Sequence, residues 1–295
     1  MFLKNKMNLS ILIPSFNWNV YRLISDLTIQ CQKEYKPDCY EIICIEDGST
    51  CLFENNKITE LNNVQYQVLK NNIGRASIRN LLAKKAKFEW LLFIDCDSKI
   101  IQQNFIQNYK IQSQSTQKDH IYYGQTIYQK NNQPDTILHE RYGLIVESKS
   151  KKTHFSSHHF LIKKELFEQA GFDEQLQLYG YEDVLFEVKS NFQFKFIDNP
   201  LYHIGLKKTD DFLKDCELGL KNLLNYTDQK DVVRKIKILK WWKRLSRIHY
   251  IILKIFIYFQ SSILKNLKSK NPRIVLFQFY KLGLLIKLKR DSIKN

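Results

Sequence analysis

The sequence lacks the cysteine patterns that would indicate a metal-stabilised or disulfide-bonded protein. Its six cysteines form no Cys-x-x-Cys pair, and no Cys/His cluster has the spacing of a zinc site. The first residues lead straight into a strand-like run, without the pattern of a secretory signal. Internal repeats and low-complexity linkers are also missing. We therefore expect a cytosolic protein with reduced thiols.

Net charge is almost absent from most of the chain. The total is +16, but residues 231–295 contain 17 Lys/Arg and 2 Asp/Glu, whereas residues 1–230 contain 29 and 28. The first 230 residues are thus typical of a neutral globular domain, and the basic character belongs to the tail. With 295 residues, 44% of them hydrophobic, the chain can form one large domain with an appendage, or two modest domains.

Short apolar runs alternate with helical patterns over the first hundred residues. Strands are predicted at 9–14, 40–45, 64–69 and 89–94, and helices at 20–32 and 73–86. This alternation predicts an α/β fold with a Rossmann-like, mostly parallel sheet covered by helices on both faces. Further strands are expected at 121–128, 155–162 and 192–197, and further helices at 164–170, from 182 onward, and at 210–226.

Two carboxylates follow the most apolar of these strands. Asp95 and Asp97 are one residue apart, so their side chains can point the same way where the strand leaves the sheet. Ligands of open α/β sheets bind at that carboxyl edge. Two converging carboxylates repel each other unless a cation lies between them, and Mg²⁺ or Mn²⁺ is the natural partner. The alternative is a solvated loop, in which Asp and Ser are common.

Acidic and basic residues elsewhere allow two interpretations each. Glu46 and Asp47 follow the second strand and are either part of a turn or acceptors for a ribose or base. Arg75 and Arg79 lie four apart on a helix, where guanidinium groups suit phosphates or a planar base, or simply face solvent.

The later candidates are a carboxylate pair and a histidine. Glu182 and Asp183 begin a helix, where they either complement its dipole or supply a general base. His203 is either structural or a third ligand for a metal held by Asp97. The His158-His159 pair alternates across a predicted strand, so at most one of the two faces the site, and neither is assigned a role.

The order and spacing of these motifs resemble those of family 2 glycosyltransferases with the GT-A fold. The resemblance covers residues 8–225 and rests on ILIPSFN at 11–17, EDGS at 46–49, residues 72–80, DCD at 95–97, GFDE at 171–174 and ED at 182–183.

The resemblance implies an inverting enzyme that uses a nucleotide-diphosphate-sugar and a divalent metal. It assigns nucleotide-sugar binding to Pro14, Ser15, Glu46, Asp47, Arg75, Arg79 and Asp95, the metal to Asp97, Asp95 and His203, and catalysis to Asp183 as base with Glu182 orienting the acceptor. Two positions depart from the family pattern. Residue 46 is Glu where Asp is commoner, and Tyr181 stands where several relatives have Trp.

The predicted partners follow from the same resemblance, and the boundary of the basic tail follows from the change in charge and pattern. The donor is expected to be a UDP-sugar and the acceptor a glycan or lipid-linked hydroxyl, in bacterial surface polysaccharide, lipopolysaccharide or glycolipid synthesis. The transferase is hexosyl- or N-acetylhexosaminyltransferase-like. The catalytic domain is predicted at 1–228, with a nucleotide-sugar half at 1–100 and an acceptor half at 101–228, followed by a basic helical extension at 229–295. The alternative is a non-catalytic relative that binds a nucleotide or glycan as a scaffold.

The tail contains apolar residues mixed with lysines. Its longest apolar run, 248–264, approaches the length of a membrane span, yet Lys254 and the polar residues 260–262 interrupt it. Basic helices with tryptophan are typical of segments that lie on an anionic membrane, which would place the enzyme at the inner face of the cell membrane. The alternative is a helical subdomain that packs on the core. Nucleic acid is not expected, because no known binding motif accompanies the charge.

Overall fold

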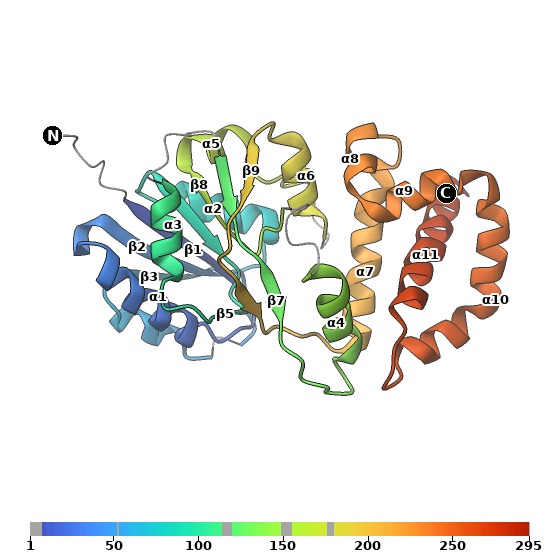
Figure 1. The fold of residues 1–295 in the computed structure, drawn as a ribbon, viewed down its shortest axis with the longest axis horizontal. Coiled ribbons are helices and arrows are strands. Elements are labelled where there is room, and N and C mark those ends of the chain that lie inside the picture. The colour runs from blue at the N-terminus through green and yellow to red at the C-terminus, as the bar shows by residue number, and fades with distance from the viewer. Residues whose placement is uncertain (1–7, 52, 114–119, 149–154, 176–179, 295) are drawn as a thin grey trace. The chain divides into compact units, whose positions relative to one another are not determined.

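The computed structural model describes residues 8–51, 53–113, 120–148, 155–175 and 180–294 (Figure 1). The chain forms two compact units, and each is described by itself. The first unit comprises Met1–Ile127, Ser150–Gln175 and Lys189–Gly205, and the second comprises Tyr128–Lys149, Leu176–Val188 and Leu206–Asn295.

The first unit contains all the strands of the described residues, and only the last residue of β7 lies outside it. Its strands are β1 (Leu9–Ser15), β2 (Tyr40–Glu46), β3 (Val64–Val68), β4 (Trp90–Ile94), β5 (Ser98–Ile100), β6 (His120–Tyr123), β7 (Thr126–Tyr128), β8 (His159–Lys163), β9 (Gln193–Phe196) and β10 (Leu201–His203). Its helices are α1 (Tyr21–Glu34), η1 (Pro37–Cys39), η2 (Asn55–Glu60), α2 (Arg75–Lys85), α3 (Phe105–Ser113) and α5 (Lys164–Ala170).

The main sheet has seven strands in the order β3-β2-β1-β4-β8-β6-β9. Strands β3, β2, β1 and β4 run parallel, β8 is antiparallel to β4 and β6, and β9 is parallel to β6. The predicted α/β fold with a mostly parallel sheet is therefore confirmed. A smaller sheet has the order β5-β10-β7.

The central strands β1, β2, β4 and β8 of the main sheet are buried on both faces, as their apolar runs predict. Ile11 and Ile13 of β1 belong to a core that also contains residues of α1 and α3. On the other face, Phe93 of β4 stacks on Phe167 of α5, with ring centroids 4.9 Å apart, and α2 lies against β1 and β2. The carboxyl ends of β1, β2 and β4 therefore emerge together from a rigid layer.

One predicted strand is divided in the structure. The run predicted as a single strand at 121–128 forms β6 in the main sheet and β7 in the smaller sheet, with Gly124 between them. A Cβ atom on Gly124 would lie 2.1 Å from His159 Cε1, so the chain bends where the imidazole needs the space.

The second unit is helical. Its helices are α4 (Ile137–Tyr142), which continues into the π-helix η3 (Gly143–Glu147), α6 (Glu182–Lys189), α7 (Thr209–Leu223), η4 (Leu224–Tyr226), α8 (Lys230–Lys235), α9 (Lys237–Arg244), η5 (Ser246–Ile248), α10 (His249–Leu267) and α11 (Ile274–Lys294). Residues of α7 share one core with α8–α11. The tail at 229–295 thus packs with residues before it, and the predicted domain boundary at 228 stays a prediction. Among the helices of the described residues, none combines the length and apolarity needed to cross a membrane.

Candidate active site

The smaller sheet brings Asp97 and His203 together. Strand β5 pairs antiparallel with β10, and Ser98 lies opposite His203. The carbonyl oxygen of Asp97 accepts a hydrogen bond from the Ile204 amide at 2.8 Å, which extends the ladder by one residue. As a result, His203 Nε2 lies 3.1 Å from Asp97 Oδ2. Two residues that are far apart in the sequence thus form one polar pair at the carboxyl edge of β4.

The surroundings of Asp97 keep its side chain ionised. Burial by itself would raise the pKa of this carboxyl, but the charge and hydrogen bond of His203, with smaller contributions from His158 and Arg75, lower it well below its ordinary value. A side chain at residue 205 would disturb the Asp97–His203 pair, because a Cβ atom on Gly205 would lie 2.3 Å from Asp97 Oδ2. The carboxylate therefore occupies a closely fitted position.

Asp95 makes a different interaction from Asp97. Its Oδ1 accepts a hydrogen bond from Arg79 Nη2 at 2.6 Å, and the Arg79 side chain is only 2% exposed. The Arg79 guanidinium carbon also lies 5.3 Å from the centre of the Phe172 ring. Arg79 thus holds the Asp95 carboxylate in place as a brace, and its predicted position near a nucleotide base stays a prediction. Arg75, one turn earlier in α2, is exposed.

The donor chemistry at this edge fits part of a divalent metal site. Asp97 supplies carboxylate oxygen and His203 imidazole nitrogen, a set that Mn²⁺ accepts. Within the described ranges, no three His, Cys, Asp or Glu side chains converge as a complete metal site. A cation held by one or two carboxylates takes its other ligands from substrate phosphates and water. The residues present are therefore compatible with a metal that binds together with a diphosphate.

Glu46 and Asp47 both point into the protein. The fully buried Glu46 carboxylate accepts hydrogen bonds from Ser49 Oγ and from Asn55 Nδ2, the latter at 2.5 Å. Asp47 uses both its oxygens, because Oδ1 accepts the Ile73 amide at 2.7 Å and Oδ2 the Gly74 amide at 3.1 Å. Burial raises the pKa of Asp47, although these two backbone amides oppose the shift.

These contacts give the two acids a shared structural task. Glu46 fastens the segment after β2, and Asp47 fastens the turn that begins α2. Pro14 and Ser15 end the neighbouring strand, where the Ser15 carbonyl oxygen accepts the Asp47 amide at 2.8 Å. The four predicted donor-binding residues 14, 15, 46 and 47 therefore lie together at one edge of the sheet.

Three residues near the pair carried no assignment from the sequence. His158 Nε2 lies 3.0 Å from Ser98 Oγ, and the rings of His158 and His203 have centroids 5.5 Å apart. His159 faces the opposite side, where its Nδ1 lies 2.6 Å from the Tyr109 hydroxyl. Of the two adjacent histidines, His158 faces the site and His159 does not, as the alternation of strand side chains requires. Gly205 is the third residue, and only its close approach to Asp97 reveals it.

The predicted catalytic acids lie in the second unit, in the first turn of α6. Glu182 is 9% exposed, and its Oε2 accepts the Gly180 amide at 3.1 Å. Asp183 Oδ1 accepts the amide of Val184 at 2.8 Å. Gly180 and Tyr181 have φ values of +103° and +67°, so the turn before α6 is sharply bent. Asn222 Nδ2 of α7 donates to the Gly180 carbonyl at 3.2 Å and fixes this turn.

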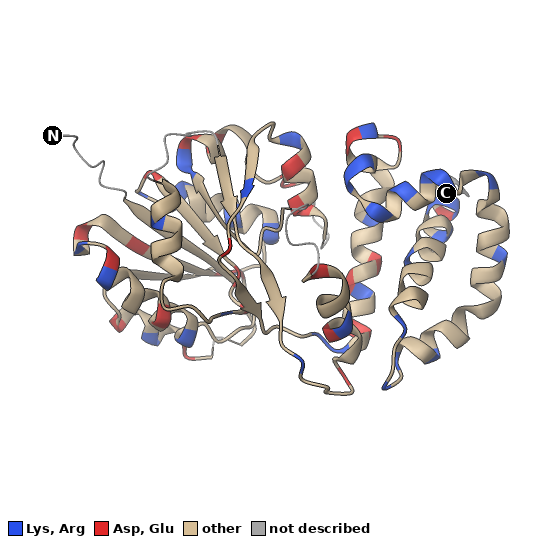
Figure 2. Cartoon of the chain, viewed as in Figure 1, with Lys and Arg blue, Asp and Glu red and all other residues tan. Residues whose placement is uncertain are grey.

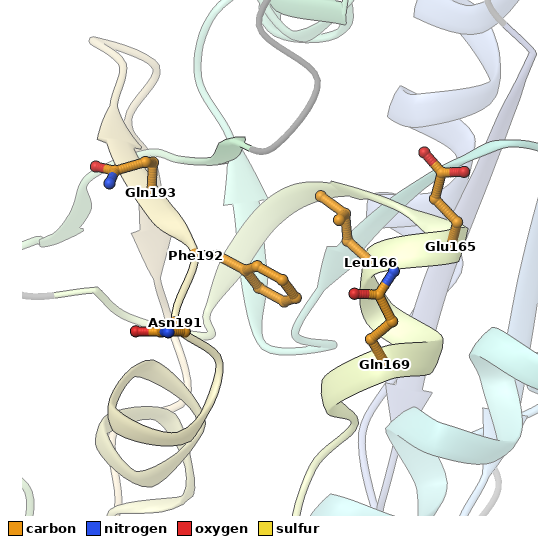
Figure 3. Close-up of a pocket in the computed structure, with 6 residues that line it drawn as sticks. All are labelled: Glu165, Leu166, Gln169, Asn191, Phe192 and Gln193. Carbon is orange, nitrogen blue, oxygen red and sulfur yellow. The ribbon is translucent and has the colours of Figure 1, made fainter.

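The first unit also has a surface pocket of about 620 Å³, and neither Glu182 nor Asp183 lines it (Figure 3). It lies between α5 and the start of β9, with the Phe192 ring pointing toward Leu166. None of the predicted site residues lines it, so it contributes nothing to the functional assignment.

Solved structures that resemble this chain include glycosyltransferases. S. aureus TarS 1-349 in complex with UDP-GlcNAc matches with a TM-score of 0.53 and 18% identity, over 98% of this chain and 92% of that chain. A longer TarS chain matches with a TM-score of 0.50 and 20% identity, and the match covers 74% of this chain and 40% of that one. The mannosyltransferase PcManGT from Pyrobaculum calidifontis, in complex with GDP-Man and Mn²⁺, matches with a TM-score of 0.58 and 11% identity, over 97% and 86%.

These likenesses establish the GT-A fold with C-terminal helices. No protein of curated function matches the chain. The family model described as "Glycosyltransferase like family 2" matches residues 10–244, which is most of the sequence. The chain therefore belongs to the glycosyltransferase-like family 2.

Proposed function

We propose that this protein is a metal-assisted, inverting glycosyltransferase that moves a sugar from a nucleotide-diphosphate-sugar to an acceptor hydroxyl. The observation that carries the proposal is the pairing of Asp97 with His203 directly after β4, in a chain of this family. TarS in complex with UDP-GlcNAc and PcManGT in complex with GDP-Man and Mn²⁺ support a nucleotide-sugar donor and a divalent metal. We favour a UDP-sugar and a hexosyl or N-acetylhexosaminyl group.

Asp97 and His203 would hold the metal, with Asp95 close by on its Arg79 brace. When bound, a divalent cation neutralises charge on the diphosphate leaving group. Metal ligands must be deprotonated, so the Asp97 carboxylate and a neutral His203 imidazole would bind the cation. The edge formed by residues 14, 15, 46 and 47 would position the nucleoside, Glu46 indirectly through its bonds to Ser49 and Asn55.

Asp183 would act as the general base. The acceptor oxygen attacks the anomeric carbon, the bond from that carbon to the diphosphate oxygen breaks, and the nucleotide diphosphate leaves with the electron pair. The acceptor hydroxyl has too high a pKa to ionise at neutral pH, so the Asp183 carboxylate takes its proton as the new bond forms. Glu182 would orient the acceptor. The acceptor class we propose is a glycan or lipid-linked glycan in bacterial surface polysaccharide or glycolipid synthesis.

A panel of nucleotide-sugars tests the proposal through melting temperature, with and without Mn²⁺. We expect one donor to stabilise the protein only with the metal, and free nucleotide to appear slowly in the same mixture. Asp97→Asn should lose the metal-dependent stabilisation. Asp183→Asn should keep it and lose transfer. Asp26→Asn, which alters a surface ion pair with Arg22, is the matched control.

Each outcome separates one role from the others. If Asp97→Asn kept the metal-dependent stabilisation, Asp97 would not be the metal ligand. If Asp183→Asn transferred sugar at the full rate, Asp183 would not be the general base. Donor binding by the wild type without any nucleotide release or transfer would favour the non-catalytic scaffold.

A further inference from the structure

Helix α10 (His249–Leu267) has both buried and exposed apolar side chains. Its inner side is buried: Ile252, Leu253, Phe256, Ile263 and Leu267 are each at most 7% exposed and belong to the core of the second unit. The contact with α11 is close, since a Cβ atom on Gly283 would lie 2.3 Å from Phe256 Cγ. This packing satisfies one side of the helix.

The opposite side of α10 is apolar as well, and it is exposed. We call the following six residues the α10 outer face: Tyr250, Ile251, Ile255, Ile257, Tyr258 and Phe259, which are between 45% and 81% exposed. Residues 251, 255 and 258 have the spacing of neighbours on one side of a helix. Single exposed apolar residues are ordinary, but a contiguous group marks an interaction surface.

Basic side chains accompany this face. Between Val232 and Arg290 the chain has 16 Lys/Arg and no Asp or Glu, and Figure 2 shows the cations along α9 and α10. Lys254 Nζ lies 4.5 Å from the centre of the Tyr250 ring, and the Arg244 guanidinium lies 5.5 Å from that of Trp241. Long cationic side chains that lie over aromatic rings combine an apolar stem with a charged head, which suits the boundary between lipid tails and headgroups.

The charge and apolarity of the α10 outer face indicate which kind of partner binds it. A second copy of this chain would bring the same cations against each other, which opposes self-association. Nucleic acid would satisfy the charge but would offer no apolar partner to Ile251, Ile255 and Ile257. A bilayer with anionic lipids satisfies both, because its headgroups are negative and its acyl chains begin within reach of the side chains. We propose that the α10 outer face docks the protein in the plane of an anionic membrane surface.

Co-sedimentation of the full chain with vesicles tests this proposal. We expect binding to vesicles of phosphatidylglycerol mixed with phosphatidylcholine, little binding to pure phosphatidylcholine, and weaker binding as salt increases. The double variant Ile251→Glu/Tyr258→Glu should weaken binding at least about tenfold, because it places charges where apolar side chains would enter the lipid. Lys243→Gln and Arg247→Gln should each weaken it roughly fivefold.

Ile111→Glu provides the matched control, since Ile111 is 56% exposed on α3 of the first unit. It should bind vesicles like the wild type. Equal binding to both kinds of vesicle, or unchanged binding by Ile251→Glu/Tyr258→Glu, would overturn the proposal. A wild-type dimer that Tyr258→Glu converts to a monomer in size-exclusion chromatography would assign the face to a second copy instead. Because vesicle binding needs no sugar transfer, either result leaves the proposed enzymatic function to its own test.

Discussion

The Gly205 backbone passes so close to the Asp97 carboxylate that a side chain at residue 205 would collide with it. A Cβ atom there would lie 2.3 Å from Asp97 Oδ2 and 2.7 Å from Asp97 Cβ. We expect Gly205→Ala to displace the carboxylate from His203 and to lower kcat/KM by about 100-fold, since misplacement by about 1 Å has that effect. Steady-state kinetics, with the donor that the melting-temperature panel identifies, measures this loss of kcat/KM.

The matched control for Gly205→Ala is Ile204→Ala, whose side chain is 42% exposed and whose backbone amide still donates to Asp97. It should retain transfer. If Gly205→Ala kept the metal-dependent stabilisation of the wild type, the fitted position of Asp97 would have no functional importance.

The buried Arg79 and the half-buried Asp95 are expected to stabilise the fold as a pair. Arg79→Met leaves Asp95 without its partner and should lower the free energy of unfolding by about 3 kcal/mol, because breaking a buried ion pair leaves an uncompensated charge. Asp95→Asn should cost less, and a double-mutant cycle in urea should give a coupling of about 1–3 kcal/mol.

Arg22→Met offers the comparison with an exposed pair. Its partner is Asp26 at 3.0 Å, and the Arg22 side chain is 86% exposed, so the loss should be about 0–1 kcal/mol. Equal losses for Arg79→Met and Arg22→Met would contradict the brace.

His159 makes the stability of the protein dependent on pH. Burial and the neighbouring His158 lower the pKa of His159 to about 3, against an ordinary value of 6.5. Between these values the unfolded chain binds the proton more tightly than the folded protein, so stability decreases as the pH falls below 6.5. His159 alone should raise the unfolding equilibrium constant about tenfold per pH unit there.

Urea unfolding between pH 4 and pH 7 measures this effect. His159→Gln should reduce the slope, whatever its effect on stability at pH 7, and leave the part due to His158, whose pKa burial lowers to about 4. Tyr109→Phe, which removes the hydroxyl 2.6 Å from His159 Nδ1 but keeps the imidazole, should retain the slope. A slope that His159→Gln left unchanged would show that other groups cause the acid sensitivity.

Glu46 is expected to determine stability rather than the choice of base. Its carboxylate is fully buried and bonded to Ser49 and Asn55, so Glu46→Asp, which withdraws it by one methylene, should cost about 1–3 kcal/mol. The preference among UDP-, GDP- and dTDP-sugars should stay the same in the melting-temperature panel. Glu60→Asp, at an exposed residue of η2, is the control. A changed preference in Glu46→Asp alone would place Glu46 beside the base.

The fold was predictable where a run of residues is buried on both faces. Strands β1, β2 and β4 have this property, and the sequence shows it as unbroken apolar runs. Strands β5 and β10 have three residues each, too few for any periodicity, and their pairing depends on tertiary contacts. The division at Gly124 was not predictable either, because the glycine is required by the His159 ring from another strand.

The candidate site was predictable in its residue types more than in their contacts. The residue types after β4 and in β10 offered Asp97 and His203 as candidate metal ligands, and the resemblance to the family favoured that interpretation. The structure brings their side chains to 3.1 Å from each other. Arg79, Glu46 and Asp47 make contacts that the sequence did not show, to Asp95, to Asn55 and to the Ile73 amide. Their assignment to the nucleotide-sugar stays a prediction. A sequence does not show which lone pairs the fold already uses.

The ladder between β5 and β10 also decides how this site can evolve. Because residue 203 lies opposite Ser98 through main-chain pairing, insertions and deletions in the loops between them leave the aspartate–histidine pair in place. A shift of one residue in the pairing register of β10 would instead place Tyr202 opposite Ser98, so that a phenol would stand where the imidazole of His203 is now. Loop length can therefore vary while the aspartate–histidine pair stays in place.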